Sequence, residues 1–104
     1  MVHIEICGLQ AEKLQEFYEK LKIVLRSPAV KNCCVGEIRV TAQPTVFLTK
    51  SFVFMKLYYN LSGFRDKDKS EAERLGSCIY RSLEEMGVDI PVYLIEVVNE
   101  IYRR

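Results

Sequence analysis

Residues 2–7 read VHIEIC, and this short stretch decides what kind of layer the chain builds first. Apolar and polar side chains alternate strictly, so that Val2, Ile4 and Ile6 point one way and the residues between them point the other way. A period of two is typical of a β-strand with one buried and one exposed face. The stretch therefore predicts a half-buried strand, which ends at Gly8.

The segment that follows, residues 10–26, has the spacing of an amphipathic helix. Its apolar residues recur every three or four positions and form one stripe: Leu14, Phe17, Tyr18, Leu21, Val24 and Leu25. Pro28 should end this helix, because the residue before a proline is pushed out of the α region. Residues 28–36 are then expected to form a loop.

Alternation returns in residues 37–43 and 52–61, and residues 90–99 form a third apolar run. These three stretches predict three more strands. Residues 44–51 contain Pro44 and no two-residue hairpin signal, so they favour a connection that travels across the sheet.

The second helix lies between the last two strands. Ser70 and Glu73 have the spacing of a capping box, which begins a helix, and Gly87 is a natural residue just after its end. Gly76 inside this helix is costly unless it permits close packing on the sheet.

The element order is therefore β-α-β-β-α-β over one domain, residues 1–104. We expect an α+β fold: a four-stranded mixed sheet with both helices on one face and parallel strands within each β-α-β unit. Four residues should lie in the core between helices and sheet: Leu21, Val40, Leu57 and Leu75.

Composition excludes several classes of function. The net charge is +1, which gives no long-range field to attract nucleic acid, and no run approaches the roughly 18 apolar residues of a membrane span. Because Glu5 interrupts the first apolar run, we expect this run to be a strand and not part of a signal peptide. Nucleic acid and membrane are therefore not expected as partners.

The cysteines point to a reduced compartment. There are four, with no CxxC pair, and the only histidine is His3, so a zinc site and other metal centres are not expected. Adjacent Cys33 and Cys34 are expected to be small fillers near a turn and not a redox pair. We expect free thiols, a cytoplasmic protein and no cofactor.

The sheet face without helices carries charges of both signs and hydrogen-bonding groups. The alternation places these residues on it: His3, Glu5, Cys7, Glu37, Arg39, Thr41, Gln43, Lys56, Tyr58 and Asn60. One interpretation is an ordinary wet face with cross-strand ion pairs. The other is an oligomer lumen or a ligand-binding face, which the large side chains of Phe52, Phe54 and Tyr58 favour.

Three stretches carry a resemblance to a known family: VHIEICGL (2–9), EIRVTAQPTVF (37–47) and FVFMKLYYNLSGFRDKDKSEAE (52–73). In pattern and spacing they resemble the tautomerase superfamily, the group of 4-oxalocrotonate tautomerase and macrophage migration inhibitory factor, and in particular a branch of small bacterial proteins. The resemblance covers nearly the whole chain. It implies two stacked β-α-β units and a homotrimer whose sheets enclose a central channel.

The same resemblance implies a catalytic proline at the mature N-terminus, but this chain has Val2 there. If Met1 is removed, Val2 exposes a primary α-amine, whose reference pKa is about 7.7–8.0. The resemblance then implies enol–keto tautomerisation of a small anionic carbonyl compound, with Val2 as the base and Arg39, Lys56 and Tyr58 holding the substrate. Without the proline, we expect weak activity or none. Arg39 and Lys56 would otherwise be ion-pair partners of Glu37 and Glu5.

The same element order also fits a ferredoxin-like domain, which opens a second hypothesis, a ligand- or RNA-binding module. Phe52, Phe54 and Tyr58 on the third strand superficially match the aromatic platform of such a sheet. The first strand offers only His3 and Glu5, and the charge is near neutral, so RNA binding is the weaker hypothesis.

Overall fold

One four-stranded sheet organises the chain, for which a computed structural model describes residues 2–33, 36–42 and 52–98. The strands are β1 (Val2–Cys7), β2 (Ile38–Ala42), β3 (Phe54–Tyr59) and β4 (Val92–Glu96). The helices are α1 (Ala11–Leu25), α2 (Pro28–Lys31) and α3 (Lys69–Glu85), with a 3-10 turn η1 at Leu61–Gly63. The predicted element order is confirmed, with α2 and η1 as additions.

The strand order separates the two folds that the sequence left open. The order is β2-β1-β3-β4, with β1 parallel to β2 and antiparallel to β3, and β3 parallel to β4. A ferredoxin-like sheet places β2 beside β3, whereas here β1 lies between them. The ferredoxin-like alternative is therefore wrong, and the tautomerase-like arrangement is confirmed. Most of the connection between β2 and β3, with Pro44 and the expected end of β2 at Gln43, lies outside the described residues.

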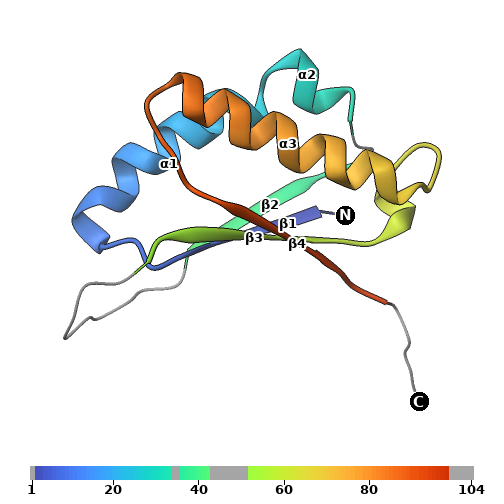
Figure 1. Ribbon diagram of the computed structural model, residues 1–104, viewed down its shortest axis with the longest axis horizontal. Helices are drawn as coiled ribbons and strands as arrows, with labels where there is room; N and C mark the ends of the chain where they lie inside the picture. The colour runs from blue at the N-terminus through green and yellow to red at the C-terminus, as the bar shows by residue number, and fades with distance from the viewer. Residues whose placement is uncertain (1, 34–35, 43–51, 99–104) are drawn as a thin grey trace.

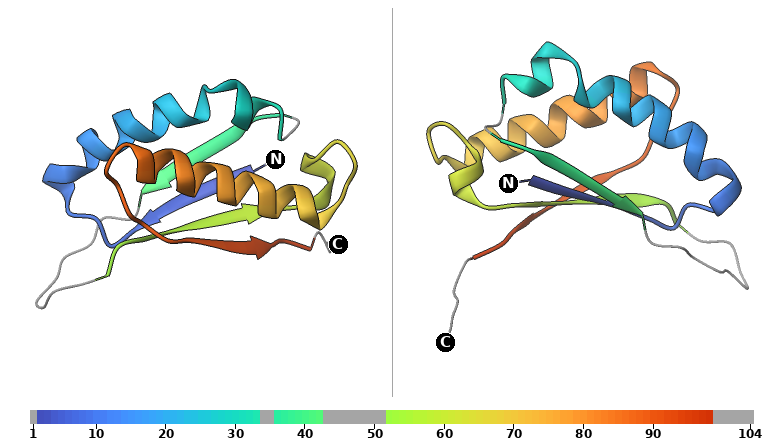
Figure 2. Two further views of the ribbon diagram at one scale, coloured as in Figure 1. Left: turned by 45° about the horizontal axis from the view of Figure 1, so that its top comes forward. Right: turned by 180° about the vertical axis from the view of Figure 1, so that it is seen from behind.

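The helices cover one face of the sheet and leave the other bare. Figure 1 shows α1, α2 and α3 on one side of the four strands, and the rotated views of Figure 2 agree. The core between these layers includes Leu21, Leu57 and Leu75, all fully buried as predicted. The prediction for Val40 is wrong: it is only half-buried, because β2 is an edge strand with a neighbour on one side alone. Tyr18 likewise lies at the exposed border of the α1 stripe.

Local capping explains the element boundaries that the sequence missed. Pro28 does end α1, but it also starts α2, because proline fits the first position of a helix and the Ser27 hydroxyl accepts the Val30 N–H at 3.4 Å. The predicted cap at Ser70 is wrong. Asp68 caps α3, and its carboxylate accepts the Ser70 N–H at 3.0 Å.

The glycines of α3 behave as expected. Gly87 follows the helix with φ +85°, and a methyl group at Gly76 would lie 2.9 Å from Leu94 Cδ2, so α3 does pack closely on β4. Of the described helices, none is long and apolar enough to cross a membrane.

Candidate functional site

Side chains from three strands form two cross-strand rows on the sheet face that carries no helix, called the helix-free face below. Residues directly opposite one another on neighbouring strands point to the same face. The first row joins β2, β1 and β3 through Arg39, His3 and Tyr58. The second row joins the same strands through Thr41, Glu5 and Lys56.

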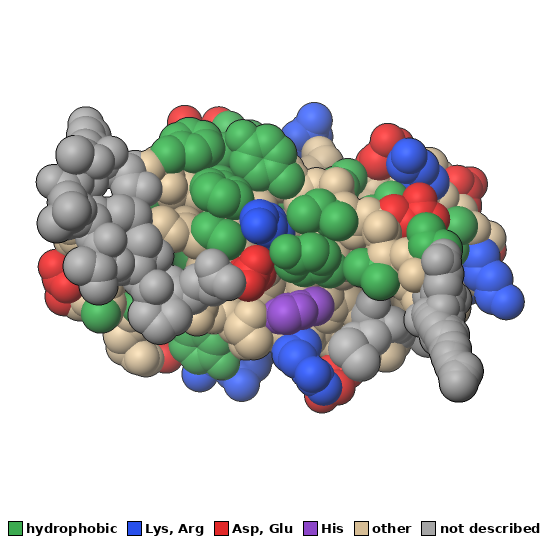
Figure 3. Space-filling view, turned by 90° about the horizontal axis from the view of Figure 1, so that it is seen from below, with side chains coloured by type: hydrophobic (Ala, Val, Ile, Leu, Met, Phe, Trp, Pro, Cys, Tyr) green, Lys and Arg blue, Asp and Glu red, His purple; other side chains and the backbone are tan. Residues whose placement is uncertain are grey.

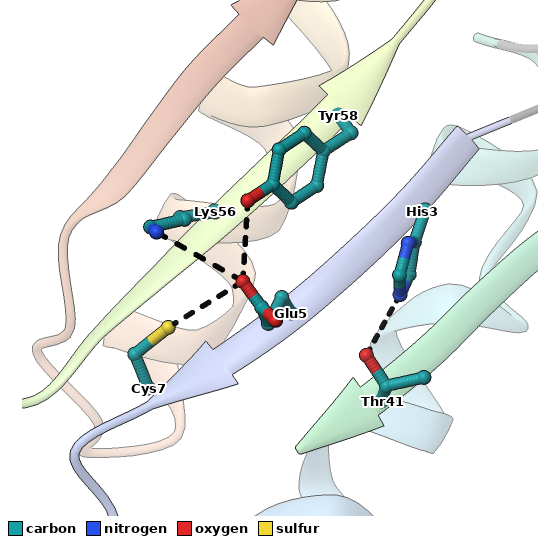
Figure 4. A network of polar contacts seen from close by, with 6 residues as sticks. All are labelled: His3, Glu5, Cys7, Thr41, Lys56 and Tyr58. Atoms are coloured by element: carbon teal, nitrogen blue, oxygen red, sulfur yellow. Dashed lines mark hydrogen bonds and ion pairs between the residues drawn. The ribbon is translucent and has the colours of Figure 1, made fainter. Parts of the chain in front are cut away.

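A polar network surrounds one carboxylate oxygen of Glu5 in the second row and draws on residues outside that row (Figure 4). Tyr58 Oη donates to Glu5 Oε1 at 3.2 Å, Lys56 Nζ lies 4.0 Å from the same oxygen, and Cys7 Sγ lies 3.9 Å from it. We call these four residues the Glu5 cluster. Its formal charges cancel, because one ammonium faces one carboxylate.

The Glu5 cluster is partly buried and keeps some exposure to solvent. The Glu5 side chain is 15% exposed and that of Lys56 is 36% exposed. Burial raises the pKa of the Cys7 thiol, and the negative charge of Glu5 raises it further, against an opposing effect of Lys56. Cys7 is therefore a proton-holding thiol and not an activated nucleophile.

His3 joins the two rows. Its Nε2 lies 2.7 Å from Thr41 Oγ1, and its ring centroid lies 5.8 Å from that of Tyr58. The histidine, the only one in the chain, is thus held between β2 and β3, with a ring that is half-buried.

A shallow pocket of about 470 Å³ opens beside these groups. It lies where β1 begins and β3 and β4 end. Its lining is formed by His3, Glu5, Tyr58, Tyr59, Asn60 and Val97. The acid–base side chains of His3 and Glu5, the Tyr58 phenol and the Asn60 amide therefore border a space of the size that holds a small molecule.

Apolar side chains flank the network on the β4 side. Phe54 stacks on Phe52 at a centroid distance of 5.7 Å and meets Tyr93 edge-on at 5.6 Å. Lys56 Nζ lies 6.0 Å from the centre of the Phe54 ring. Figure 3, which looks onto this face, shows apolar groups around one basic and one acidic side chain, with the histidine beside them.

Of the four residues that the sequence singled out, Arg39, Lys56 and Tyr58 lie on this face, and Val2 points to the opposite, helix-covered face. Val2 N–H donates to the Glu37 carbonyl at 3.3 Å, and the Val2 side chain is buried in the core. Arg39 is exposed in the row of His3. Lys56 and Tyr58 both contact Glu5, so the structure brings these two together and leaves Arg39 across β1 from them.

The alternative interpretation of these cations is confirmed for one of them. Lys56 and Glu5 do form an ion pair, whereas no ion pair of Arg39 with Glu37 is found in the part of the chain that the structure describes. Arg39 and Glu37 lie two positions apart along the chain, so they are not cross-strand partners.

Sequence reasoning placed Glu5, His3 and Cys7 on this face but gave them no role in the site. The sequence feature that could have identified them is the alternation in β1, which places Glu5 and the chain's single histidine on the same face of an inner strand. No group of three or more His, Cys, Asp or Glu positioned to hold a metal ion is found within residues 2–33, 36–42 and 52–98.

Comparison with known proteins adds information on the fold. No family model matches the sequence, and no curated protein matches it. Among solved structures, a domain of unknown function (DUF1904) from Sebaldella termitidis is similar at a TM-score of 0.50 and 17% identity, over 96% of this chain and 90% of that one.

Two further structures are macrophage migration inhibitory factor proteins. Leishmania major MIF2 is 12% identical at a TM-score of 0.49, over 93% of this chain and 89% of that one. The MIF-like protein of Entamoeba histolytica is 16% identical at a TM-score of 0.44, over 93% and 87%. At these identities the likeness concerns the fold, and the strand order gives the fold as tautomerase-like.

Proposed function

We propose that this chain is a tautomerase-like protein that binds a small carbonyl compound with a carboxylate on the helix-free face and slowly interconverts its keto and enol forms. The observation that carries the proposal is the pocket of about 470 Å³, which has Glu5 and His3 in its lining. Keto–enol interconversion needs a group that takes a proton and returns it at a second atom, and both side chains can do so.

The substrate's carboxylate needs a cation. Arg39 lies beside His3 in the cross-strand row, and a guanidinium pairs well with a carboxylate. Lys56 is a weaker candidate for binding the carboxylate, because its ammonium already pairs with the Glu5 carboxylate. Tyr58 lines the pocket and offers a ring and a hydroxyl. We assign Arg39 to the carboxylate, with Lys56 and the ring of Tyr58 at the carbonyl end, since the Tyr58 hydroxyl already donates to Glu5.

Removal of Met1 would add a third acid–base group. The α-amine of Val2 would then lie at the start of β1, near the end of the sheet where the pocket opens. A primary amine lacks the ring that pre-organises proline, so turnover by this route should be slow.

The test is turnover of phenylenolpyruvate, followed by loss of its enol absorbance. We expect saturable turnover by the wild type and a rise in KM of about 10-fold or more for Arg39→Ala, because a charge-assisted contact is lost. Lys31→Ala is the matched control, since it removes an exposed cation from the helical side. Absence of both binding and turnover in the wild type would contradict the proposal.

A homotrimer is the assembly that fits this proposal. Large apolar side chains stay exposed near β4 in the single chain: Phe52 at 58%, Tyr93 at 49% and Val98 at 69%. Phe52 and Tyr93 both contact Phe54, and an exposed apolar cluster of this kind is typical of an interface. Light scattering at micromolar concentration should give three times 12.1 kDa, and a clean monomer would contradict the trimer.

The cytoplasmic location is inferred from the interpretation of the cysteines as reduced thiols, and it stays a prediction.

A further inference from the structure

We infer that Glu5 is the acid–base residue of this site, so that proton transfer does not depend on the chain's N-terminal amine. The inference rests on the proposed function and names the group that performs its central step. It comes from the different surroundings of the two carboxylate oxygens of Glu5.

The two oxygens of Glu5 have different surroundings. Oε1 faces the Tyr58 hydroxyl at 3.2 Å, the Cys7 thiol at 3.9 Å and the Lys56 ammonium at 4.0 Å. Within the described residues, Oε2 has no hydrogen bond or ion pair. A carboxylate has about four lone-pair positions. Among the residues that the structure describes, three groups face Oε1 and none donates to Oε2, so Oε2 is the oxygen that we assign to proton transfer.

Oε2 belongs to a residue that lines the pocket. Glu5 is part of the lining of about 470 Å³, and its side chain keeps 15% exposure, enough for contact with a bound molecule. Partial burial also weakens competition from water for the same oxygen. Glu5 therefore has both a fixed orientation and access to a ligand.

A role for Glu5 as the ion-pair partner of Lys56 alone does not explain why the Tyr58 hydroxyl is the nearest group to Oε1. The ammonium stands at 4.0 Å, whereas the nearest donor to Oε1 is the neutral Tyr58 hydroxyl at 3.2 Å. Partly exposed ion pairs contribute little to stability. The phenol orients the carboxylate more directly than the cation does, which is what a positioned base needs.

The alternative base, Val2, is less well placed for the chain that keeps Met1. Its nitrogen then belongs to a peptide bond and donates to the Glu37 carbonyl at 3.3 Å. The Val2 side chain lies in the core. Glu5 requires no processing of the chain, so activity through Glu5 should be the same with and without Met1.

The step balances with one proton and no redox change. In the enol-to-keto direction, Glu5 Oε2 takes the proton from the enol oxygen, the O–H electron pair forms the carbonyl π bond, and the C=C pair is released to the neighbouring carbon. The protonated Glu5 then returns its proton to that carbon, which forms the new C–H bond. Tyr58 and Lys56 act as positioning residues at Oε1.

The experiment compares Glu5→Gln with Glu37→Gln, which neutralises an exposed carboxylate just before β2. Three quantities are measured for each chain: phenylenolpyruvate turnover, the Kd of phenylpyruvate, and folding by circular dichroism. Mass spectrometry verifies whether Met1 is retained. Tyr58→Phe is added to separate positioning from folding.

We expect Glu5→Gln to lose at least about 100-fold in kcat, or to fall to the buffer rate, with Kd changed by less than about 3-fold. Glu37→Gln should be unchanged, and Tyr58→Phe should lower kcat with KM retained. Wild-type activity that survives in folded Glu5→Gln, or that arises only after Met1 is removed, would overturn the inference. If the wild type binds phenylpyruvate but does not turn over phenylenolpyruvate, the acid–base role of Glu5 is wrong and the binding role of the helix-free face stands. If the wild type shows neither binding nor turnover, the proposed function is wrong as well.

Discussion

Replacement of Gly8 by alanine tests how closely the turn after β1 approaches the start of β3. Gly8 has φ +86°, and an added Cβ would lie 2.2 Å from the Phe52 carbonyl oxygen and 3.2 Å from Val53 Cα. The left-handed conformation costs an L-residue about 1–2 kcal/mol, of which about 0.4–1 kcal/mol is regained from the less flexible unfolded chain. The clash is with backbone, which cannot rotate away, and overpacking of this kind adds about 1–3 kcal/mol.

We therefore expect Gly8→Ala to lower the free energy of unfolding by about 3 kcal/mol. Gly87→Ala is the matched control, because Gly87 has φ +85° but no described atom within 4 Å of the added Cβ, so it should lose only about 1 kcal/mol. Urea titration gives both values, and with about 4–8 °C per kcal/mol the melting temperature of Gly8→Ala should fall by roughly 12–24 °C. Equal losses in the two variants would refute the close approach of this turn to Phe52.

Three more predictions follow from the core, a cap and a thiol. Leu75→Ala should lower stability by about 2–5 kcal/mol in urea titration, because Leu75 is fully buried, and an unchanged midpoint would show α3 to be misplaced. Asp68→Ala should lose about 1 kcal/mol and Ser70→Ala almost nothing, because Asp68 caps α3; the reverse ranking would restore Ser70 as the cap. The Cys7 pKa is raised by burial and by Glu5, so Cys7 alkylation, mapped by mass spectrometry against pH, should start above the ordinary thiol range and shift down in Glu5→Gln. Because the folded chain holds this proton more tightly, the associated stability is complete below the ordinary thiol pKa and declines as pH rises through the raised one; a Cys7 pKa at or below the ordinary value would contradict the burial of the thiol.

Much of the fold could be predicted from periodicity. Strict alternation in β1 and the spacing of apolar residues in α1 and α3 depend only on which face each element buries, and that information is local. The strand order was harder to predict, because it depends on the path of the connection between β2 and β3. The choice between the tautomerase-like and ferredoxin-like folds rested on Pro44 and on the absence of a two-residue hairpin signal in that connection. The cap of α3 was misassigned by two positions, since Asp68 and Ser70 are both good capping residues.

The candidate site was only partly predictable. Alternation placed the polar residues on one face, but which side chains contact one another depends on strand register, which a single sequence does not give. The register sets Glu5 opposite Lys56 and His3 opposite Tyr58, and this converts a polar face into the Glu5 cluster. Family resemblance directed attention to the N-terminal amine and away from Glu5, the residue that the geometry favours.

The most direct test of the central claim is a map of where a small carbonyl carboxylate binds. Phenylpyruvate is titrated into isotope-labelled protein, and amide shifts are followed by NMR. We predict saturable shifts at His3, Tyr58 and Asn60, at the pocket of the helix-free face, with α1 and α3 unaffected. Shifts confined to the helical side, or no saturable shift at millimolar ligand, would contradict the account.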